Sequence, residues 1–79
     1  MNYLSLDKLP INKTGKIINL HCHNNLRRRL LDLGFIRGAK ITASFKNPSG
    51  NPIAYEIRNT IIALRKEDAQ FIEISLLDN

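Results

Sequence analysis

Leucine residues recur with the period of an α-helix in one stretch of the chain. Leu26, Leu30 and Leu33 stand at i, i+4 and i+7, so they line one stripe of a short helix, and Leu31 widens that stripe. Arginine and aspartate occupy the remaining positions of the stretch. The pattern therefore predicts an amphipathic helix whose leucine stripe packs on the core.

Asparagine and glycine residues mark the expected ends of this helix and the expected positions of two turns. Asn24 or Asn25 can cap its start, because an asparagine side chain accepts hydrogen bonds from the free amides of the first turn. Gly34 is the expected stop, since glycine adopts a positive φ after a helix without steric cost. Gly38 fits the third position of a type II turn, and Asn59 suits a tight hairpin. We expect Gly34, Gly38 and Asn59 to be structural turn residues.

Apolar and polar residues alternate with a period of two in most other stretches, which is typical of half-buried β-strands. The expected strands are residues 17–22, 40–46, 53–58, 61–64 and 71–76, with a single helical turn at 65–69. In the first strand the alternation places Leu20 and Cys22 on one face and Ile17 on the other. In the second it points Phe45 inward. Residues 3–6 form a short apolar piece, and residues 13–16 are expected to form a polar turn.

About five short strands and one short helix predict a mainly β fold. A small, strongly bent barrel removes the exposed edges that a lone sheet would leave. We predict an SH3-like β-barrel, with an OB-like barrel as the alternative. The 79 residues are expected to form a single domain over residues 1–79, with no room for a deep active-site cleft.

The charge of the chain narrows the class of partner. Twelve Lys and Arg against seven Asp and Glu give a net charge of +5 at pH 7. This favours an anionic partner: a nucleic acid, a phosphate, an acidic protein face or a membrane surface. No apolar run approaches the roughly 20 residues of a membrane span, and the N-terminus lacks a signal-peptide pattern. With one cysteine, Cys22, no internal disulfide is possible, so the cytoplasm is the expected compartment.

Catalytic and metal-binding patterns are sparse. The sequence has no phosphate loop, no nucleophile turn and no evident carboxylate pair, so we expect a protein that is not an enzyme. His21 and His23 would share a face of an extended strand, with Cys22 pointing away. A closed zinc site needs four ligands, so these histidines are only weak candidates for binding Fe(II) or Zn(II). Burial of Cys22 as a small hydrophobic residue explains the cluster more simply.

Three consecutive arginines are the first candidate for contacting a partner. Arg27, Arg28 and Arg29 lie in the first turns of the predicted helix, where the helix dipole disfavours each surface cation by ~0.3–1 kcal/mol. Only Asp32 can offset this charge locally, through i+4 and i+3 pairs. A solvated helix face is the simpler explanation, but the electrostatic cost makes a binding role worth testing.

A loop dense in turn-forming residues is the second candidate. Residues 47–52 include Pro48, Ser49, Gly50 and a second proline, so the segment should be exposed and stiff. We predict that Pro48, Ser49 and Gly50 are available for contact with a partner.

Three motifs at fixed spacing resemble the FeoA family. They are Arg-Leu-Leu-Asp-Leu-Gly-Phe at 29–35 followed by Gly38, the loop Pro-Ser-Gly-Asn-Pro-Ile at 48–53, and Ile-Ala-Leu-Arg-Lys-Glu-Asp-Ala at 62–69 followed by Ile72 and Ile74. The resemblance runs from about residue 5 to residue 76. Three positions depart from the family pattern: Arg37 where proline is common, Ser49 where an apolar residue is common, and Asn59 where glycine is frequent.

The resemblance implies a function as well as an SH3-like fold. FeoA proteins are small cytoplasmic accessory proteins of Fe(II) uptake, thought to bind the cytoplasmic part of FeoB, the GTPase-coupled iron permease, at the inner face of the membrane. The alternatives are a nucleic-acid-binding small barrel, suggested by the charge, and a transition-metal carrier. The strand alternation assigns Phe45, Tyr55 and Phe71 to core or hairpin packing, so no specific nucleic acid is expected. Association of the chain with itself is left open by the sequence.

Overall fold

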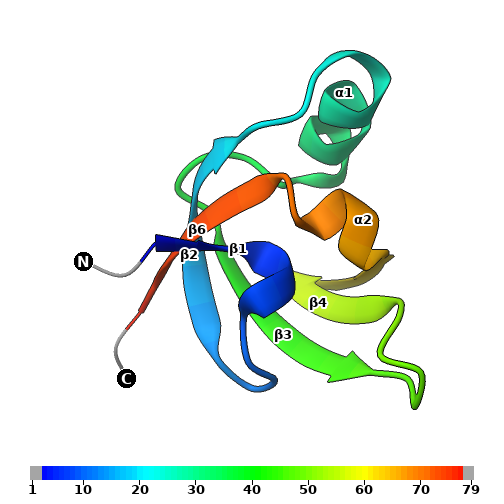
Figure 1. Cartoon of the computed structure of the whole chain (residues 1–79). Coiled ribbons are helices and arrows are strands. Elements are labelled where there is room, and N and C mark those ends of the chain that lie inside the picture. Colours follow the sequence, from blue (N-terminus) through cyan, green and yellow to red (C-terminus); the bar gives the residue numbers. More distant parts are fainter. Residues whose placement is uncertain (1–2, 78–79) are drawn as a thin grey trace.

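The computed structural model describes residues 3–77, which form a bent β-sheet with helices at one end (Figure 1). In chain order the elements are β1 (Tyr3–Ser5), a 3-10 helix η1 (Leu6–Lys8), β2 (Thr14–Leu20), α1 (Asn24–Leu33), β3 (Lys40–Lys46), β4 (Ile53–Ile57), β5 (Thr60–Leu64), α2 (Lys66–Ala69) and β6 (Ile72–Leu76). The predicted mainly β architecture with a short helix is confirmed. The strand that the sequence did not predict is β1, because three residues are too few to show an alternation.

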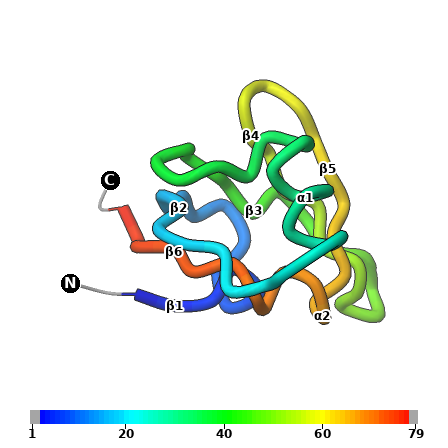
Figure 2. Tube along the Cα trace, turned by 90° about the horizontal axis from the view of Figure 1, so that it is seen from above, coloured from blue at the N-terminus to red at the C-terminus, as the bar shows by residue number. Residues whose placement is uncertain are grey.

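All strand pairs are antiparallel, in the order β1-β6-β2-β3-β4-β5. The sheet curls so that its inner face surrounds the core, with α1 above one end and α2 beside it (Figure 1). Figure 2 shows the strands wrapping around the centre of the molecule when it is seen from above. Because the sheet is strongly curved, its apolar inner face covers the same core from two sides.

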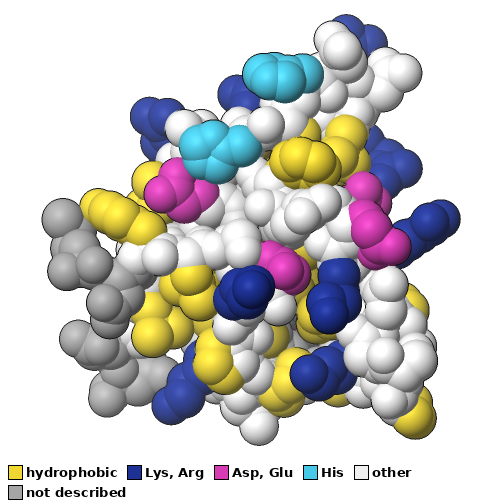
Figure 3. Space-filling view, in the orientation of Figure 1, with side chains coloured by type: hydrophobic (Ala, Val, Ile, Leu, Met, Phe, Trp, Pro, Cys, Tyr) yellow, Lys and Arg dark blue, Asp and Glu magenta, His cyan; other side chains and the backbone are white. Residues whose placement is uncertain are grey.

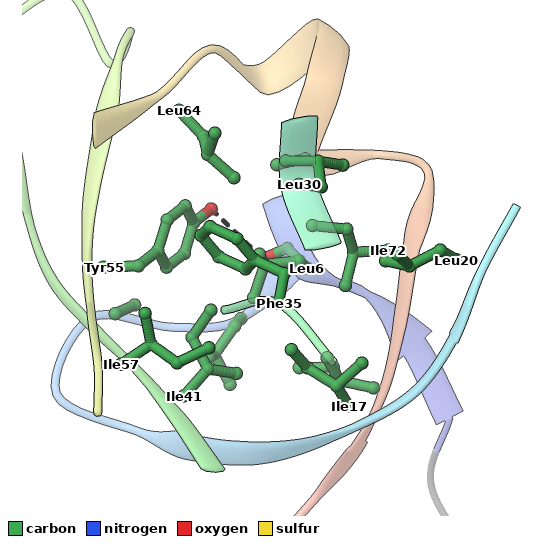
Figure 4. Close-up of a cluster of buried hydrophobic side chains, with 14 of the residues drawn as sticks. Leu6, Ile17, Leu20, Leu30, Phe35, Ile41, Tyr55, Ile57, Leu64 and Ile72 are labelled. Carbon is green, nitrogen blue, oxygen red and sulfur yellow. Dashed lines mark hydrogen bonds between the residues drawn. The ribbon is translucent and has the colours of Figure 1, made fainter. Parts of the chain in front are cut away.

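The core is apolar and is filled from every part of the sheet (Figure 4). Leu30 from α1 and Phe35 after it are fully buried beside Tyr55 from β4. The Tyr55 hydroxyl donates a hydrogen bond to the carbonyl oxygen of Leu6 at 3.3 Å. Burial, aided by the negative charge of Asp7, raises the pKa of Tyr55, so this hydroxyl keeps its proton and remains a donor.

Strand β2 differs from its prediction at both ends. It begins at Thr14, so the expected polar turn at residues 13–16 is wrong over most of its length. Gly15 within it is buried. A register shift between Ile17 and Asn19 then offsets the alternation, so Ile17 and Leu20 both face the core.

A second register shift corrects the expected orientation of Phe45. Ile41 and Ala43 on β3 are buried as predicted, but the pairing with β4 shifts between Ala43 and Phe45. After a β-bulge the alternation of faces is inverted. Phe45 consequently points outward, with 60% of its surface exposed.

The leucine stripe of α1 is narrower than predicted. Leu30 is fully buried and Leu26 is half-buried, but Leu31 and Leu33 are exposed. Because α1 lies over one end of the barrel, only one face of one helical turn contacts the core (Figure 1). The N-cap residue is His23, without a capping side-chain hydrogen bond, which corrects the expectation of an asparagine cap.

Candidate functional site

The three predicted turn residues have positive φ angles: Gly34 at 106°, Gly38 at 91° and Asn59 at 65°. Gly34 follows α1, and its N–H donates to the carbonyl oxygens of the last helical turn. The turn around Gly38 is closed by a hydrogen bond from the Ala39 N–H to the Ile36 carbonyl at 3.1 Å. The Gly38 N–H also donates to the Ile17 carbonyl at 2.8 Å, which fixes this turn against β2.

The three consecutive arginines have different environments. Arg27 donates from Nη1 to the carbonyl oxygen of Leu20 at 2.9 Å, so it ties α1 to the end of β2. Arg29 forms an ion pair with Asp68 of α2, with Nη2 and Oδ2 3.3 Å apart. Among residues 3–77, the Arg28 side chain makes no hydrogen bond or ion pair. Of the three cations, Arg28 is therefore the one free to meet a partner.

The expected neutralisation by Asp32 is not present. Asp32 lies with Arg27, Arg28 and Leu31 around a surface depression of about 360 Å³, but it pairs with no arginine within residues 3–77. The carboxylate that does meet the run, Asp68, comes from another helix. Arg27 therefore links α1 to β2, and Arg29 links it to α2. The depression beside Arg27 and Arg28 is basic and partly apolar.

The loop at 47–52 is ordered by its own side chains. The Ser49 hydroxyl lies 2.7 Å from Asn47 Oδ1 and 3.0 Å from the Asn51 carbonyl oxygen. Asn51 donates from Nδ2 to Glu67 Oε1 at 3.2 Å and accepts from the Lys66 N–H, which attaches the loop to α2. The Glu67 backbone N–H and the Asn51 amide hold the pKa of Glu67 below its usual range. Ser49 is exposed, although its hydroxyl is occupied within the loop.

The two histidines lie beyond the end of β2, so the strand geometry expected for them is wrong. His21 Nε2 is 2.8 Å from Glu73 Oε1 on β6, whereas His23 is exposed at the start of α1. Cys22 between them is buried. Figure 3 shows both histidine side chains, in cyan, on one face of the molecule. Over residues 3–77, no three His, Cys, Asp or Glu side chains gather in a way that could hold a metal ion.

This geometry predicts weak metal binding. Anaerobic titration of the protein with Fe(II) or Zn(II) should reveal no tight stoichiometric site, because His21 and Glu73 supply only two ligands. Isothermal titration calorimetry at neutral pH measures the affinity. The double substitution His21→Ala, His23→Ala serves as the control. A tight site in the wild type that this variant loses would contradict the prediction.

The structure also gathers cations that the sequence does not connect. Arg37, Lys40 and Arg58 line one surface depression of about 480 Å³, together with Ile36, Gly38 and Ala39. Arg37 comes from the turn before β3, Lys40 begins β3, and Arg58 lies in the β4–β5 hairpin. Arg37 and Lys40 are close in the sequence, but Arg58 joins them only through the pairing of β3 with β4.

A separate feature concerns the membrane. Neither α1 nor α2, the two α-helices described within residues 3–77, has the length and apolar character needed to cross a bilayer.

Comparison with known proteins identifies the fold and the family. A family profile described as "FeoA domain" matches residues 4–76. The chain is similar to an NMR structure of a FeoA-like protein from Clostridium acetobutylicum, with a TM-score of 0.90 and 30% identity over 100% of this chain and 92% of that one. It is also similar to a zinc complex of FeoA from Stenotrophomonas maltophilia, described as an SH3 domain protein, with a TM-score of 0.81 and 26% identity over 91% of this chain and 89% of that one. The SH3-like fold is thereby confirmed.

Two curated relatives are similar over nearly the whole chain. A putative Fe(2+) transport protein A from Campylobacter jejuni is 34% identical over 94% of this chain and 100% of its own length. A fusion of Fe(2+) transport protein A with the Fe(2+) transporter FeoB from Porphyromonas gingivalis is 30% identical over 96% of this chain, which spans only 9% of the fusion protein. Together with the match over residues 4–76, these similarities show that the chain belongs to the FeoA domain family.

Proposed function

We propose that this protein supports Fe(II) uptake by binding the cytoplasmic part of a FeoB-type iron permease, as a binding module and not as an enzyme. The observation that carries the proposal is the Porphyromonas gingivalis fusion, in which a segment similar to 96% of this chain is joined to the transporter FeoB. Covalent linkage keeps two modules at a high effective concentration. A fusion is therefore expected where the two parts act together, and separate chains with the same task must bind each other.

The charge of the protein supports an electrostatic contribution to this binding. The chain carries a net charge of +5, and complementary charge mainly raises the association rate and fixes the orientation of the partners. Arg28 is exposed and unpaired within residues 3–77, whereas Arg27 and Arg29 already have partners in the fold. We therefore place the contribution of the arginine run to partner binding at Arg28.

The test is co-purification of the tagged protein with the permease from detergent-solubilised membranes of the source cell, together with Fe(II) uptake by cells that lack the protein. The proposal requires that the wild type captures the permease and that uptake slows in its absence. Absence of both effects would refute the proposed function.

Arg28→Gln should weaken capture of the permease about two- to fivefold, as expected for an exposed charge at the edge of an interface. The melting temperature should stay unchanged, because the Arg28 side chain forms no hydrogen bond or ion pair within residues 3–77 that the substitution removes. Ser49→Ala is a comparison with a smaller expected effect, since the Ser49 hydroxyl is occupied inside its loop. Undiminished capture by Arg28→Gln would exclude this arginine while leaving the proposed function in place.

A further inference from the structure

A group of cations without acidic partners lies at the end of the barrel where β3 begins. Arg37, Lys40 and Arg58 border the same depression of about 480 Å³, and none of its lining residues is acidic. None of the three forms an ion pair within residues 3–77. Figure 2 shows the connection between α1 and β3 and the β4–β5 hairpin on the same side of the molecule, away from β1.

The strand register adds a fourth cation. Lys16 of β2 is directly opposite Lys40 of β3, so both side chains project from the same face of the sheet. Like charges in directly opposed positions destabilise a sheet. The nearest carboxylate on that face in the register is Glu56, opposite Thr42 and so diagonal to Lys40, and it forms no ion pair with the lysine. The fold thus gathers several positive charges that no carboxylate within residues 3–77 neutralises through an ion pair.

Two of the cations lie against neighbouring parts of the fold. Arg37 donates from Nε to the carbonyl oxygen of Ile18 at 3.0 Å, which orients the guanidinium and leaves its two Nη groups for other acceptors. The stem of Arg58 crosses the end of α1, with its Cδ 3.3 Å from the position that a Cβ on Gly34 would occupy. A cation is favoured at the C-terminus of a helix by the helix dipole. Arg37 is therefore partly pre-organised, which lowers the entropic cost of binding a ligand.

Apolar side chains accompany the charges. Ile36 and Ala39 line the depression, and 38% of the surface of Ile36 is exposed. Carboxylates of a ligand can pair with the cations while its apolar side chains cover Ile36. A protein segment that mixes acidic and apolar residues satisfies both requirements.

Nucleic acid fits this surface less well. Binding of single strands relies on exposed aromatic side chains beside the cations. Phe45 is the most exposed aromatic residue described, but it is five residues from Lys40 along β3, or about 17 Å. Tyr3 lies on β1, at the opposite edge of the sheet from β5. The depression itself is lined by no aromatic residue.

From these observations we infer that Arg37, Lys40 and Arg58 form a docking site for an acidic, partly apolar peptide segment of the protein's partner. The identity of that partner rests on the proposed function, whereas the chemistry of the segment follows from the site. Lys16 adds to the positive field at the rim, and Ile36 supplies the apolar floor.

The first experiment measures binding to the purified cytoplasmic fragment of the permease by biolayer interferometry. The triple variant Arg37→Gln, Lys40→Gln, Arg58→Gln should raise Kd at least about tenfold, because three charge pairs are lost at once. The control variant Lys8→Gln, Lys13→Gln, Lys46→Gln removes the same net charge from exposed positions elsewhere and should change Kd less than about threefold. Equal loss in both variants would show that only net charge matters and would overturn the assigned site.

The second experiment needs no permease. A synthetic hexapeptide of alternating glutamate and leucine is added to the ¹⁵N-labelled full chain, and amide shifts are followed by NMR. The amides of residues 36–40 and 58 should shift in the wild type and not in the triple variant, whose spectrum also verifies its fold. No shift at these residues in the wild type would overturn the docking site, whether or not the permease fragment binds.

The same titration with inorganic phosphate, a single-stranded oligodeoxynucleotide and phosphatidylglycerol vesicles tests the other anions. Stronger perturbation of residues 36–40 by any of these than by the peptide would overturn the choice of an acidic peptide. If the peptide binds this surface but the permease fragment does not bind the protein, the site stands and the proposed function fails.

Discussion

Leu30→Ala should lower the free energy of unfolding by about 2–5 kcal/mol, the range for truncating a buried leucine. Leu30 is fully buried and is the side chain through which α1 enters the core (Figure 4). It packs there near Ile72 of β6 and Phe35, so its removal leaves a cavity between the helix and the barrel. Urea unfolding followed by far-UV circular dichroism measures the change.

Leu33→Ala is the matched control for this substitution. The same atoms are deleted from the same helix, but Leu33 is 42% exposed, so the expected loss is below about 1 kcal/mol. Equal losses in the two variants would contradict the orientation of α1 on the barrel. Large losses at both positions would favour the wider leucine stripe expected from the sequence, in which Leu30 and Leu33 both pack on the core.

This pair of leucines also shows what helical periodicity can predict. The spacing of Leu26, Leu30 and Leu33 correctly indicates a helix ending before Gly34. The spacing cannot indicate how much of the leucine stripe packs on the barrel, because that depends on where the helix lies on it. Here α1 covers one end of a barrel, and a residue one turn beyond the contact is already at the surface.

Strand alternation fails for a different physical reason. Ile41, Tyr55 and Ile57 face the core as their patterns predict. Phe45 does not, because a bulge inverts the faces after Ala43. A bulge has no reliable sequence signature. The face of the sheet on which a residue lies can therefore be predicted only as far as the bulge. Because Phe45 is exposed, its position and not its burial decides against nucleic-acid binding: it does not line the depression bordered by Arg37, Lys40 and Arg58.

The candidate sites follow the same division between local and long-range information. The positive φ angles at Gly34, Gly38 and Asn59 are local requirements, which the residue types express directly. The partners of Arg27 and Arg29, by contrast, are a strand carbonyl and a carboxylate 39 residues away. The convergence of Arg37, Lys40 and Arg58 depends on a turn, a strand and a hairpin meeting in space. Local sequence patterns do not indicate which distant elements pack together.

Gly15→Val should lower the free energy of unfolding by about 2–3 kcal/mol, the cost of overpacking a tight interior. Gly15 is buried in β2, opposite Ile41 of β3 and Leu76 of β6. A Cβ at this position would lie 2.7 Å from Ile74 Cδ1 and 3.1 Å from the Ser75 carbonyl oxygen. The isoleucine tip can rotate, but the carbonyl belongs to the paired strand and can move only with the sheet.

Lys16→Val is the matched control, because it introduces the same side chain one residue along β2 at an exposed position. Valine suits a strand, so this variant should stay within about 0.5 kcal/mol of the wild type. Thermal and urea unfolding of the three proteins at one pH give the comparison. A Gly15→Val protein as stable as the wild type would mean that β2 does not pass between β3 and β6 at this position. The chain would then have the polar turn at residues 13–16 that its sequence suggests.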